Sequence, residues 1–302
     1  MKSIQVTRPG AVTVAEVDAP RPRAGEALLR VCYAGICGSD IQTFRGTQPF
    51  ASYPRVPGHE FSAEIVELGG ASEDFAVGDV VTGVPYFQDG TCYSCRRGLI
   101  NACVHNETMG VHRDGAFQEL ITMPLDRLHT ADGVDPRDLA LVEPFSIGYH
   151  AVLRADVAEG VRVLVLGAGA IGLLTKLSAL TRGAEVWIAD DVVCEATGLP
   201  VSFLNAVEAS AVGARIVLIG NGTREVTFNQ STLIKKELTV LGSRNSAGVF
   251  DTLIDLLARK VVDVSPLRTR IVPLTGAAEA LESAAQGASG EIKVLIEFPA
   301  GS

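Results

Sequence analysis

The arrangement of apolar and polar residues differs between the two halves of the chain. Up to about residue 145, short apolar runs are separated by turns rich in glycine, proline and aspartate. These runs cover residues 27–34, 64–68, 80–84 and 117–123. Short runs of β-type residues bounded by turn residues are typical of strands. The first half therefore predicts a β-rich domain with long loops.

From about Ser146 the pattern becomes helical and then alternates between strand and helix. Residues 162–166 have the pattern of a buried strand that leads into a glycine turn and a helix, the opening of a βαβ unit. Alternating strands and helices predict a second domain of the α/β class with a doubly wound parallel sheet. A helix is expected at residues 250–260. Further strands are expected at 185–190, 214–220 and 237–241, and a last strand of the chain at 292–298.

One connection in this second domain is too short for a parallel sheet. Asp190 ends one predicted strand and Asp191 begins the next, so no residues remain for a crossover. Parallel strands need a connection of about a dozen residues or more, usually with a helix. A hairpin is disfavoured because residues 189–192, Ala-Asp-Asp-Val, contain no glycine for a primed turn. We therefore expect that one βαβ portion is absent after Asp190, either omitted from the numbering or deleted from the chain.

Composition restricts the class of protein and its partners. The chain has 302 residues, 47% of them hydrophobic, which suits two domains with sizeable cores. A formal net charge of -9 opposes binding to nucleic acid. No apolar run is long enough to span a bilayer, and the first ten residues lack the apolar segment of a signal peptide. We expect a cytoplasmic protein with neither nucleic-acid nor membrane partners.

The glycine turn after residue 166 matches a dinucleotide-binding fingerprint. The segment GAGAIG, with Gly167, Gly169, Ile171 and Gly172, fits Gly-x-Gly-x-x-Gly between a strand and a helix, where bare backbone admits a pyrophosphate. Asp190 ends the next predicted strand, where an acid can accept hydrogen bonds from the adenosine ribose and repel a 2′-phosphate. Asp190 therefore favours NAD over NADP. The alternative interpretation of the glycine turn is a packing turn without a ligand.

Six cysteines suggest thiols and metal ligands rather than disulfides in such a chain. Asp89, Cys92, Cys95 and Cys103 have the spacing of a closed tetrahedral zinc site, which would stabilise a lobe rather than react. The carboxylate of Asp89 stands where a fourth thiolate is more usual. The alternative is three free thiols without a metal.

A third set of candidate ligands is spread along the first half. Cys37 lies in GICGSD, His59 and Glu60 in PGHEF, and Glu143 in VEPF, each at a turn beside a β-type run. Each residue alone has an ordinary structural explanation. Together they offer the S, N and O donors of a catalytic zinc that keeps one position open.

Several motifs in order along nearly the whole chain resemble the medium-chain, zinc-dependent alcohol and polyol dehydrogenases. They are GICGSD, GHEFSAEIVELG, VGDVV, the lobe with Cys92 and Cys103, VEPFSIGYHAV and VLGAGAIGLL. QPFASYPRVPGHE, GVHRDGAFQEL and KKELTVLGSRNS look most similar to the sugar-acid and polyol branch. The resemblance implies a GroES-like catalytic domain at 1–145, completed by 276–302, and a Rossmann NAD-binding domain at 146–275.

The resemblance also implies roles for individual residues. Cys37, His59 and Glu143 would hold the catalytic zinc, with Glu60 a direct or water-bridged ligand. Ser39 would bond the substrate hydroxyl and pass on its proton. Asp40 would lie beside a metal ligand. Arg45 or Arg244 would contact the substrate carboxylate or the cofactor.

The expected function is hydride transfer between NAD and a secondary alcohol of a polyol or sugar acid, in a homodimer or homotetramer with two zinc ions per chain. This sequence departs from the family at Gln42, where a proton-relaying histidine is frequent, and at Ala63, where glycine is usual. The competing hypothesis is a catalytically silent relative that keeps the metal and the fold for a structural or binding role.

Overall fold

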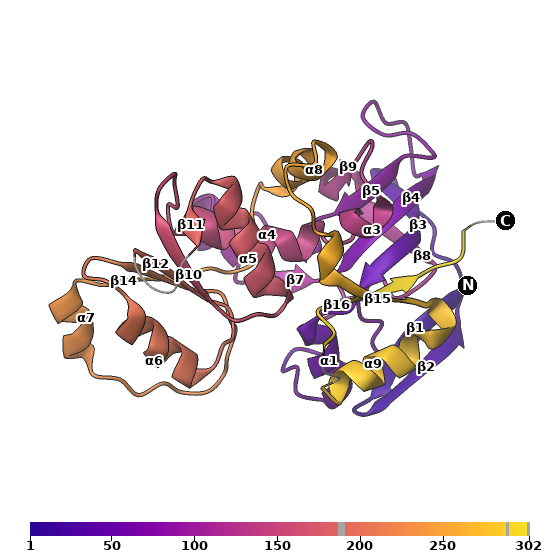
Figure 1. Cartoon of the computed structure of the whole chain (residues 1–302). Coiled ribbons are helices and arrows are strands. Elements are labelled where there is room, and N and C mark those ends of the chain that lie inside the picture. The colour runs from indigo at the N-terminus through magenta and orange to yellow at the C-terminus, as the bar shows by residue number, and fades with distance from the viewer. Residues whose placement is uncertain (187–190, 288–289, 301–302) are drawn as a thin grey trace. The chain divides into compact units, whose positions relative to one another are not determined.

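The computed structural model describes residues 1–186, 191–287 and 290–300 (Figure 1). Contacts between residues divide the chain into two compact units. Unit 1 consists of Met1–Glu143 and Phe250–Ser302, and unit 2 of Pro144–Val249. Unit 2 thus ends before residue 275, the limit proposed from the sequence for the nucleotide-binding domain.

Unit 1 is organised around a sheet of seven strands among the described residues. The order is β15-β16-β3-β4-β5-β9, and β8 also pairs with β3. All pairs in this sheet are antiparallel except β15 with β16. The strands are β3 (Glu26–Gly35), β4 (Glu60–Leu68), β5 (Val80–Gly83), β8 (Leu120–Pro124), β9 (Leu128–Thr130), β15 (Arg268–Pro273) and β16 (Lys293–Glu297).

Apolar side chains from these strands form the core of unit 1. Leu29 and Val31 on β3 and Phe61 and Ile65 on β4 are fully buried. Burial of such side chains contributes roughly 1.5–3 kcal/mol each. The sheet therefore fixes the ends of β3 and β4, and the loops that follow β3 and precede β4 carry candidate ligands.

Two smaller sheets and short helices complete unit 1. Helices α1 (Gly38–Arg45) and α9 (Ala277–Ala285) lie side by side, next to the sheet of β1 and β2 (Figure 1). These elements are β1 (Lys2–Arg8), β2 (Ala11–Glu16), β6 (Tyr86–Phe87), β7 (Glu107–Thr108), α1 (Gly38–Arg45), α2 (Tyr93–Arg96), α3 (Pro136–Leu139), α8 (Phe250–Ala258), α9 (Ala277–Ala285), and the 3-10 turns η1 (Ile100–Ala102), η2 (Leu125–Arg127), η3 (Ser265–Leu267) and η4 (Leu274–Gly276).

Unit 2 is a parallel sheet with helices on both faces. Its described strands have the order β11-β10-β12-β13-β14, and every neighbouring pair is parallel. The elements are β10 (Arg162–Leu166), β11 (Glu185–Val186), β12 (Val192–Glu195), β13 (Arg215–Leu218), β14 (Thr239–Gly242), α5 (Ala170–Thr181), α6 (Pro200–Ala209) and α7 (Gln230–Lys236), with α4 (Val142–Arg154) starting just before the unit.

Strand β12 is covered by helices on both faces of the sheet. All four of its residues are buried, as expected for a parallel strand between two layers of helices. Val192 and Cys194 belong to a core cluster with residues of α4 and α5, whereas Val193 belongs to another with residues of α6. The α/β class and the doubly wound sheet predicted from the sequence are confirmed.

The register of the described residues shows the levels at which β11 and β12 pair with β10. Val186 and Val192 both pair with Val163, from opposite sides of β10, so they lie at the same level of the sheet. Two strand spacings separate them by roughly 10 Å.

Among the described residues, no helix or further strand lies between β11 and β12. The deletion of one βαβ portion after Asp190 stays a prediction. Asp190 itself, and its Cα separation from Asp191, lie outside the described residues. Among the residues that are described, no helix is long and apolar enough to cross a membrane.

Candidate metal centres and nucleotide site

One buried carboxylate connects the segments that carry Cys37 and His59. Cys37 is the N-cap of α1, and its N–H donates to Asp40 Oδ2 at 2.8 Å. The other oxygen, Asp40 Oδ1, accepts the N–H of Gly58 at 3.0 Å, next to His59 in the chain. Asp40 Oδ1 is also 3.9 Å from His59 Nδ1. Because Asp40 accepts a hydrogen bond from the backbone of each segment, it fixes the spacing of the two segments.

Cys37, His59 and Glu60 form a group of potential metal ligands. One ligand atom from each lies within 4.8 Å of the others. Burial alone lowers the pKa of His59, but the charge of Cys37, a hydrogen bond to Cys37 and the charges of Asp40 and Glu143 raise it well above the usual 6.5. So much negative charge around a buried imidazole favours a cation. The S, N and O donors fit zinc.

A buried lysine holds the Glu60 carboxylate. Lys293 Nζ lies 2.7 Å from each oxygen of Glu60 and 3.3 Å from the carbonyl oxygen of Ile36. Glu60 is fully buried and Lys293 is 4% exposed. Lys293 is not among the residues predicted from the sequence, because it lies in the last strand and no local motif links it to Glu60.

Glu143 is not one of the residues in this group, although its charge acts on His59, and it has its own partner. Its side chain is 3% exposed, and its Oε1 accepts a hydrogen bond from the hydroxyl of Tyr86. Burial raises the pKa of Glu143, whereas the charge of His59 lowers it. Tyr86 was also missed from the sequence, since one tyrosine in a loop-rich region gives no signal.

Ser39 brings a hydroxyl to the same helix end as Cys37. Its Oγ is buried and has no hydrogen-bond partner among the described residues. His59 Nδ1 is likewise buried without a partner in the described part of the chain. Unpaired buried polar atoms are costly, so they are typical of sites that await a ligand.

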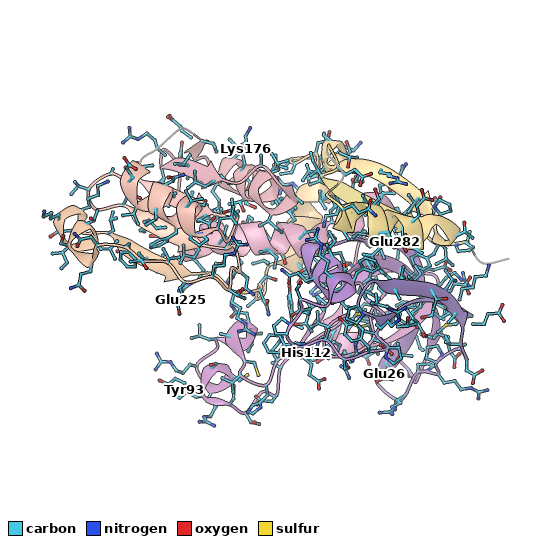
Figure 2. The ribbon with its side chains drawn as sticks, turned by 90° about the horizontal axis from the view of Figure 1, so that it is seen from below. Glu26, Tyr93, His112, Lys176, Glu225 and Glu282 are labelled. Carbon is cyan, nitrogen blue, oxygen red and sulfur yellow. The ribbon has the colours of Figure 1, made fainter. Side chains whose placement is uncertain are left out.

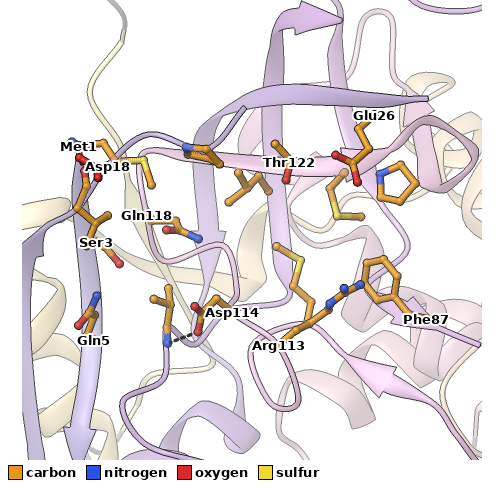
Figure 3. Close-up of a pocket in the computed structure, with 17 residues that line it drawn as sticks. Met1, Ser3, Gln5, Asp18, Glu26, Phe87, Arg113, Asp114, Gln118 and Thr122 are labelled. Carbon is orange, nitrogen blue, oxygen red and sulfur yellow. Dashed lines mark hydrogen bonds between the residues drawn. The ribbon is translucent and has the colours of Figure 1, made fainter. Parts of the chain in front are cut away.

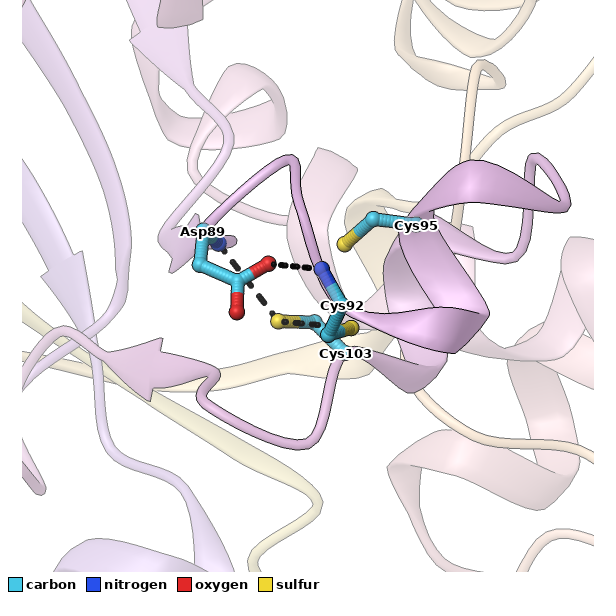
Figure 4. A group of neighbouring side chains, drawn as sticks. All are labelled: Asp89, Cys92, Cys95 and Cys103. Carbon is cyan, nitrogen blue, oxygen red and sulfur yellow. Dashed lines mark hydrogen bonds between the residues drawn. The ribbon is translucent and has the colours of Figure 1, made fainter.

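The second group of ligands is the lobe predicted from its cysteine spacing. Asp89, Cys92, Cys95 and Cys103 each place one ligand atom within 4.8 Å of the others (Figure 4). The sulfur atoms of Cys92 and Cys103 are 3.8 Å apart. A tetrahedral ion with bonds of about 2.3 Å separates its sulfur ligands by about 3.8 Å. The group therefore fits a closed zinc site.

Asp89 fits this site as a carboxylate ligand. Its Oδ1 accepts the N–H groups of Thr91 and Cys92 at 2.8 and 2.9 Å. Hydrogen bonds from Cys92 and Thr91 lower the pKa of Asp89 to about 2, so it is ionised at neutral pH. Backbone hydrogen bonds also lower the pKa of Cys92 to about 7, whereas burial raises that of Cys95 to about 12. Tyr93 on the same lobe is 68% exposed (Figure 2).

The glycine turn after β10 has the shape of a pyrophosphate cradle. Gly167 has φ +119°, and a Cβ on Gly172 would lie 1.8 Å from the carbonyl oxygen of Gly167. A Cβ on Gly169, the N-cap of α5, meets nothing within 4 Å. Helix and strand thus need glycine at 172 for close packing, while Gly169 borders open space at a helix N-terminus. Ile171 follows in the first turn of α5.

The structure separates the two arginines considered from the sequence. The guanidinium of Arg45 donates to the carbonyl oxygen of Ala285 at the end of α9. It is therefore held by the protein itself, which argues against a role in contacting substrate. Arg244 is exposed in the loop after β14.

A separate cavity of about 420 Å³ opens in unit 1 (Figure 3). Its polar lining includes Ser3, Glu26, Arg113 and Gln118. The residues that line it include none of the predicted zinc ligands. It is therefore distinct from both metal groups.

Comparison with known proteins agrees with this architecture. Residues 23–133 match the family model of the alcohol dehydrogenase GroES-like domain, and residues 160–259 match that of the zinc-binding dehydrogenases. The chain belongs to the zinc-binding medium-chain alcohol and polyol dehydrogenases. It is thus an oxidoreductase of the dehydrogenase kind, as the motifs predicted.

Within this family the chain is similar to L-galactonate-5-dehydrogenase of Escherichia coli (strain K12). The two are 34% identical, with 93% of this chain and 94% of the relative covered. The alignment spans 320 positions, more than the 302 residues of the chain, so the relative has residues that this chain lacks. This agrees with a deletion.

Two solved structures share the fold and contain nicotinamide cofactors. One is a putative zinc-binding dehydrogenase from Sinorhizobium meliloti 1021 bound to NADP, with TM-score 0.92, 27% identity and 98% of each chain covered. The other is the short chain alcohol dehydrogenase (rspB) from E. coli CFT073 with NADH, with TM-score 0.91, 30% identity and 99% of each chain covered.

Proposed function

We propose that this chain is a zinc-dependent dehydrogenase that transfers hydride between NAD and a secondary alcohol of a polyol or sugar acid. The observation that carries the proposal is the group of Cys37, His59 and Glu60, with donor atoms within 4.8 Å of one another. Glu143 adds a carboxylate whose charge acts on His59. Such chemistry needs a zinc site that keeps one coordination position open, whereas a zinc that stabilises a lobe needs no open position.

Each residue has a defined task in this proposal. Cys37, His59 and Glu143 hold the catalytic zinc, and Glu60, paired with Lys293, is a direct or water-bridged ligand. Zinc supplies a Lewis acid that lowers the pKa of a bound alcohol, and NAD accepts the hydride. The unpaired hydroxyl of Ser39 accepts the alcohol proton and passes it toward solvent. Gln42 cannot continue this relay as a histidine would.

The cofactor is proposed to bind on unit 2. Its pyrophosphate would be held by the turn of Gly167, Gly169, Ile171 and Gly172, at the N-terminus of the 12-residue helix α5. Asp190 selects NAD by bonding the ribose, a proposal from the sequence alone. Arg244 contacts the cofactor from the loop after β14.

The substrate class rests on relatives rather than on a contact in this chain. Besides L-galactonate-5-dehydrogenase, the relatives include 2-dehydro-3-deoxy-L-galactonate 5-dehydrogenase of Pseudoalteromonas atlantica at 30% identity. Both names denote sugar-acid dehydrogenases. We accordingly propose a sugar acid or polyol as substrate and a homodimer or homotetramer as the assembly.

A second candidate function is favoured by one observation. Among the described residues, no βαβ portion lies between β11, at Glu185–Val186, and β12, which begins at Val192. A nucleotide-binding unit without this portion has less structure for the adenosine half of NAD. The candidate is a catalytically silent relative that retains zinc and the fold.

One experiment distinguishes the two functions. Zinc-loaded protein is incubated with NAD and a panel of sugar acids and polyols, and NADH is followed by its near-ultraviolet absorbance. If the chain is a dehydrogenase, we expect NADH to form with at least one secondary alcohol. The Cys37→Ser variant should form no NADH. A folded wild type with two zinc ions per chain and no NADH signal supports the silent relative.

A further inference from the structure

The hydrogen bond from Tyr86 to Glu143 joins an unassigned residue to a proposed zinc ligand. Tyr86 is 7% exposed and Glu143 is 3% exposed, so water competes little for this bond. Glu143 follows the first residue of α4, which fixes its backbone but not its side chain. A carboxylate on a flexible side chain needs a partner to keep one orientation.

Several contacts hold the backbone of Tyr86 in place. Tyr86 pairs with Thr108 of β7, and its carbonyl oxygen accepts a hydrogen bond from Arg127. The same Arg127 donates to Gln88 Oε1 at 2.6 Å. The neighbouring ring of Phe87 has the guanidinium of Arg113 4.0 Å from its centroid. These contacts fix the tyrosine backbone from both sides, so its hydroxyl can set the position of another group.

The strand that carries Tyr86 also begins the metal lobe. Asp89 is the second residue after β6 along the chain, and Cys103 precedes β7 by a few residues. The lobe therefore starts and ends on this two-stranded sheet. A metal that closes the lobe also holds β6, the strand from which Tyr86 reaches Glu143.

We propose that Tyr86 is a positioning residue of the catalytic zinc site: its hydroxyl orients the Glu143 carboxylate toward the metal. The inference rests on the proposed function, because it requires zinc at Cys37, His59 and Glu143. The loss of such a partner of a metal ligand typically weakens metal binding 10- to 100-fold.

Tyr86→Phe tests the proposal because it removes only the hydroxyl. Zinc-loaded protein is mixed with excess chelator, and zinc release is followed over time. A Cys37→Ser protein, which keeps only the lobe zinc, identifies the phase that belongs to the lobe. We expect Tyr86→Phe to accelerate release from the catalytic site roughly 10- to 100-fold and to leave the lobe phase unchanged. Cobalt in the catalytic site should show a shifted visible spectrum.

Tyr33→Phe is the matched control. Tyr33 also donates to a carboxylate, Glu297 Oε1 at 2.8 Å, and belongs to the same unit. It should leave both release phases unchanged. Wild-type release rates and cobalt spectrum in Tyr86→Phe overturn the inference alone. Equal acceleration of both phases overturns it too, because Tyr86 then acts on general stability. A wild type without a Cys37-dependent zinc phase refutes the proposed function as well.

Discussion

Replacement of Lys293 by methionine isolates the buried ion pair beside the candidate catalytic group. Methionine keeps most of the apolar stem but leaves the fully buried Glu60 without its cation. Metal-free protein is the right sample, because zinc bound near Glu60 would replace part of the lost charge.

The size of the effect follows from the burial of both partners. Removal of one partner of a buried ion pair typically costs about 3–5 kcal/mol. At about 2–4 °C for each kcal/mol in a unit of this size, the melting temperature should fall by roughly 6–20 °C. Because a domain is stabilised by only about 5–15 kcal/mol, the loss is a large share of the total.

Thermal unfolding of three variants measures this contribution. Lys293→Met should show the full loss, and Lys293→Met with Glu60→Gln should recover much of it, since no lone charge remains. Arg30→Met is the control, because the Arg30–Glu64 pair is about one third exposed and worth about 1 kcal/mol or less. A melting temperature for Lys293→Met as high as that of Arg30→Met would refute the reasoning.

The pH dependence gives an independent check of the same pair. Burial lowers the pKa of Lys293, but the charges of Glu60, Cys37 and Glu143 and the hydrogen bond to Glu60 together raise it above its usual 10.5. A raised pKa means that the contribution is complete below about pH 10.4 and is lost as the pH rises through the folded-state pKa. The wild type should therefore lose its advantage over Lys293→Met only in strongly alkaline solution.

Three further predictions concern the other sites. Gly172→Ala should destabilise unit 2 by about 1–3 kcal/mol, because its Cβ meets the Gly167 carbonyl, whereas Gly169→Ala should keep the melting temperature and weaken NADH binding in a fluorescence titration. Asp89→Cys should slow zinc release to a chelator, and Asp89→Ala should lower the zinc content from two to one per chain, as metal analysis would show. Asp190→Ala should weaken NAD binding and ease NADP binding; an unchanged preference in kinetics would count against its role.

Local spacing explains what the sequence could predict. The glycine turn at 167–172 and the lobe from Asp89 to Cys103 need residues close together in the chain, so their chemistry is visible in short motifs. The strands β3, β5, β10 and β16 also agree with the apolar runs to within a few residues. Such runs of apolar residues, alternate or consecutive, directly indicate which residues of a strand are buried.

Long-range pairs could not be predicted in this way. Tyr86 and Glu143 are 57 positions apart, and Glu60 and Lys293 are 233 apart. Their contact depends on how separate strands are packed, and no periodic pattern records it. The levels of β11 and β12 are a further example, because only the register shows that Val186 and Val192 both pair with Val163.

The two stretches of unit 1 have a consequence for the order of folding. Unit 2 is continuous in sequence, so its strands are available for pairing as soon as residue 249 has been synthesised. Unit 1 must wait, because β16 pairs with β3 only after nearly the whole chain has emerged. A nascent chain that stops before Lys293 already contains every predicted zinc ligand, yet it lacks the cation that holds Glu60 in place.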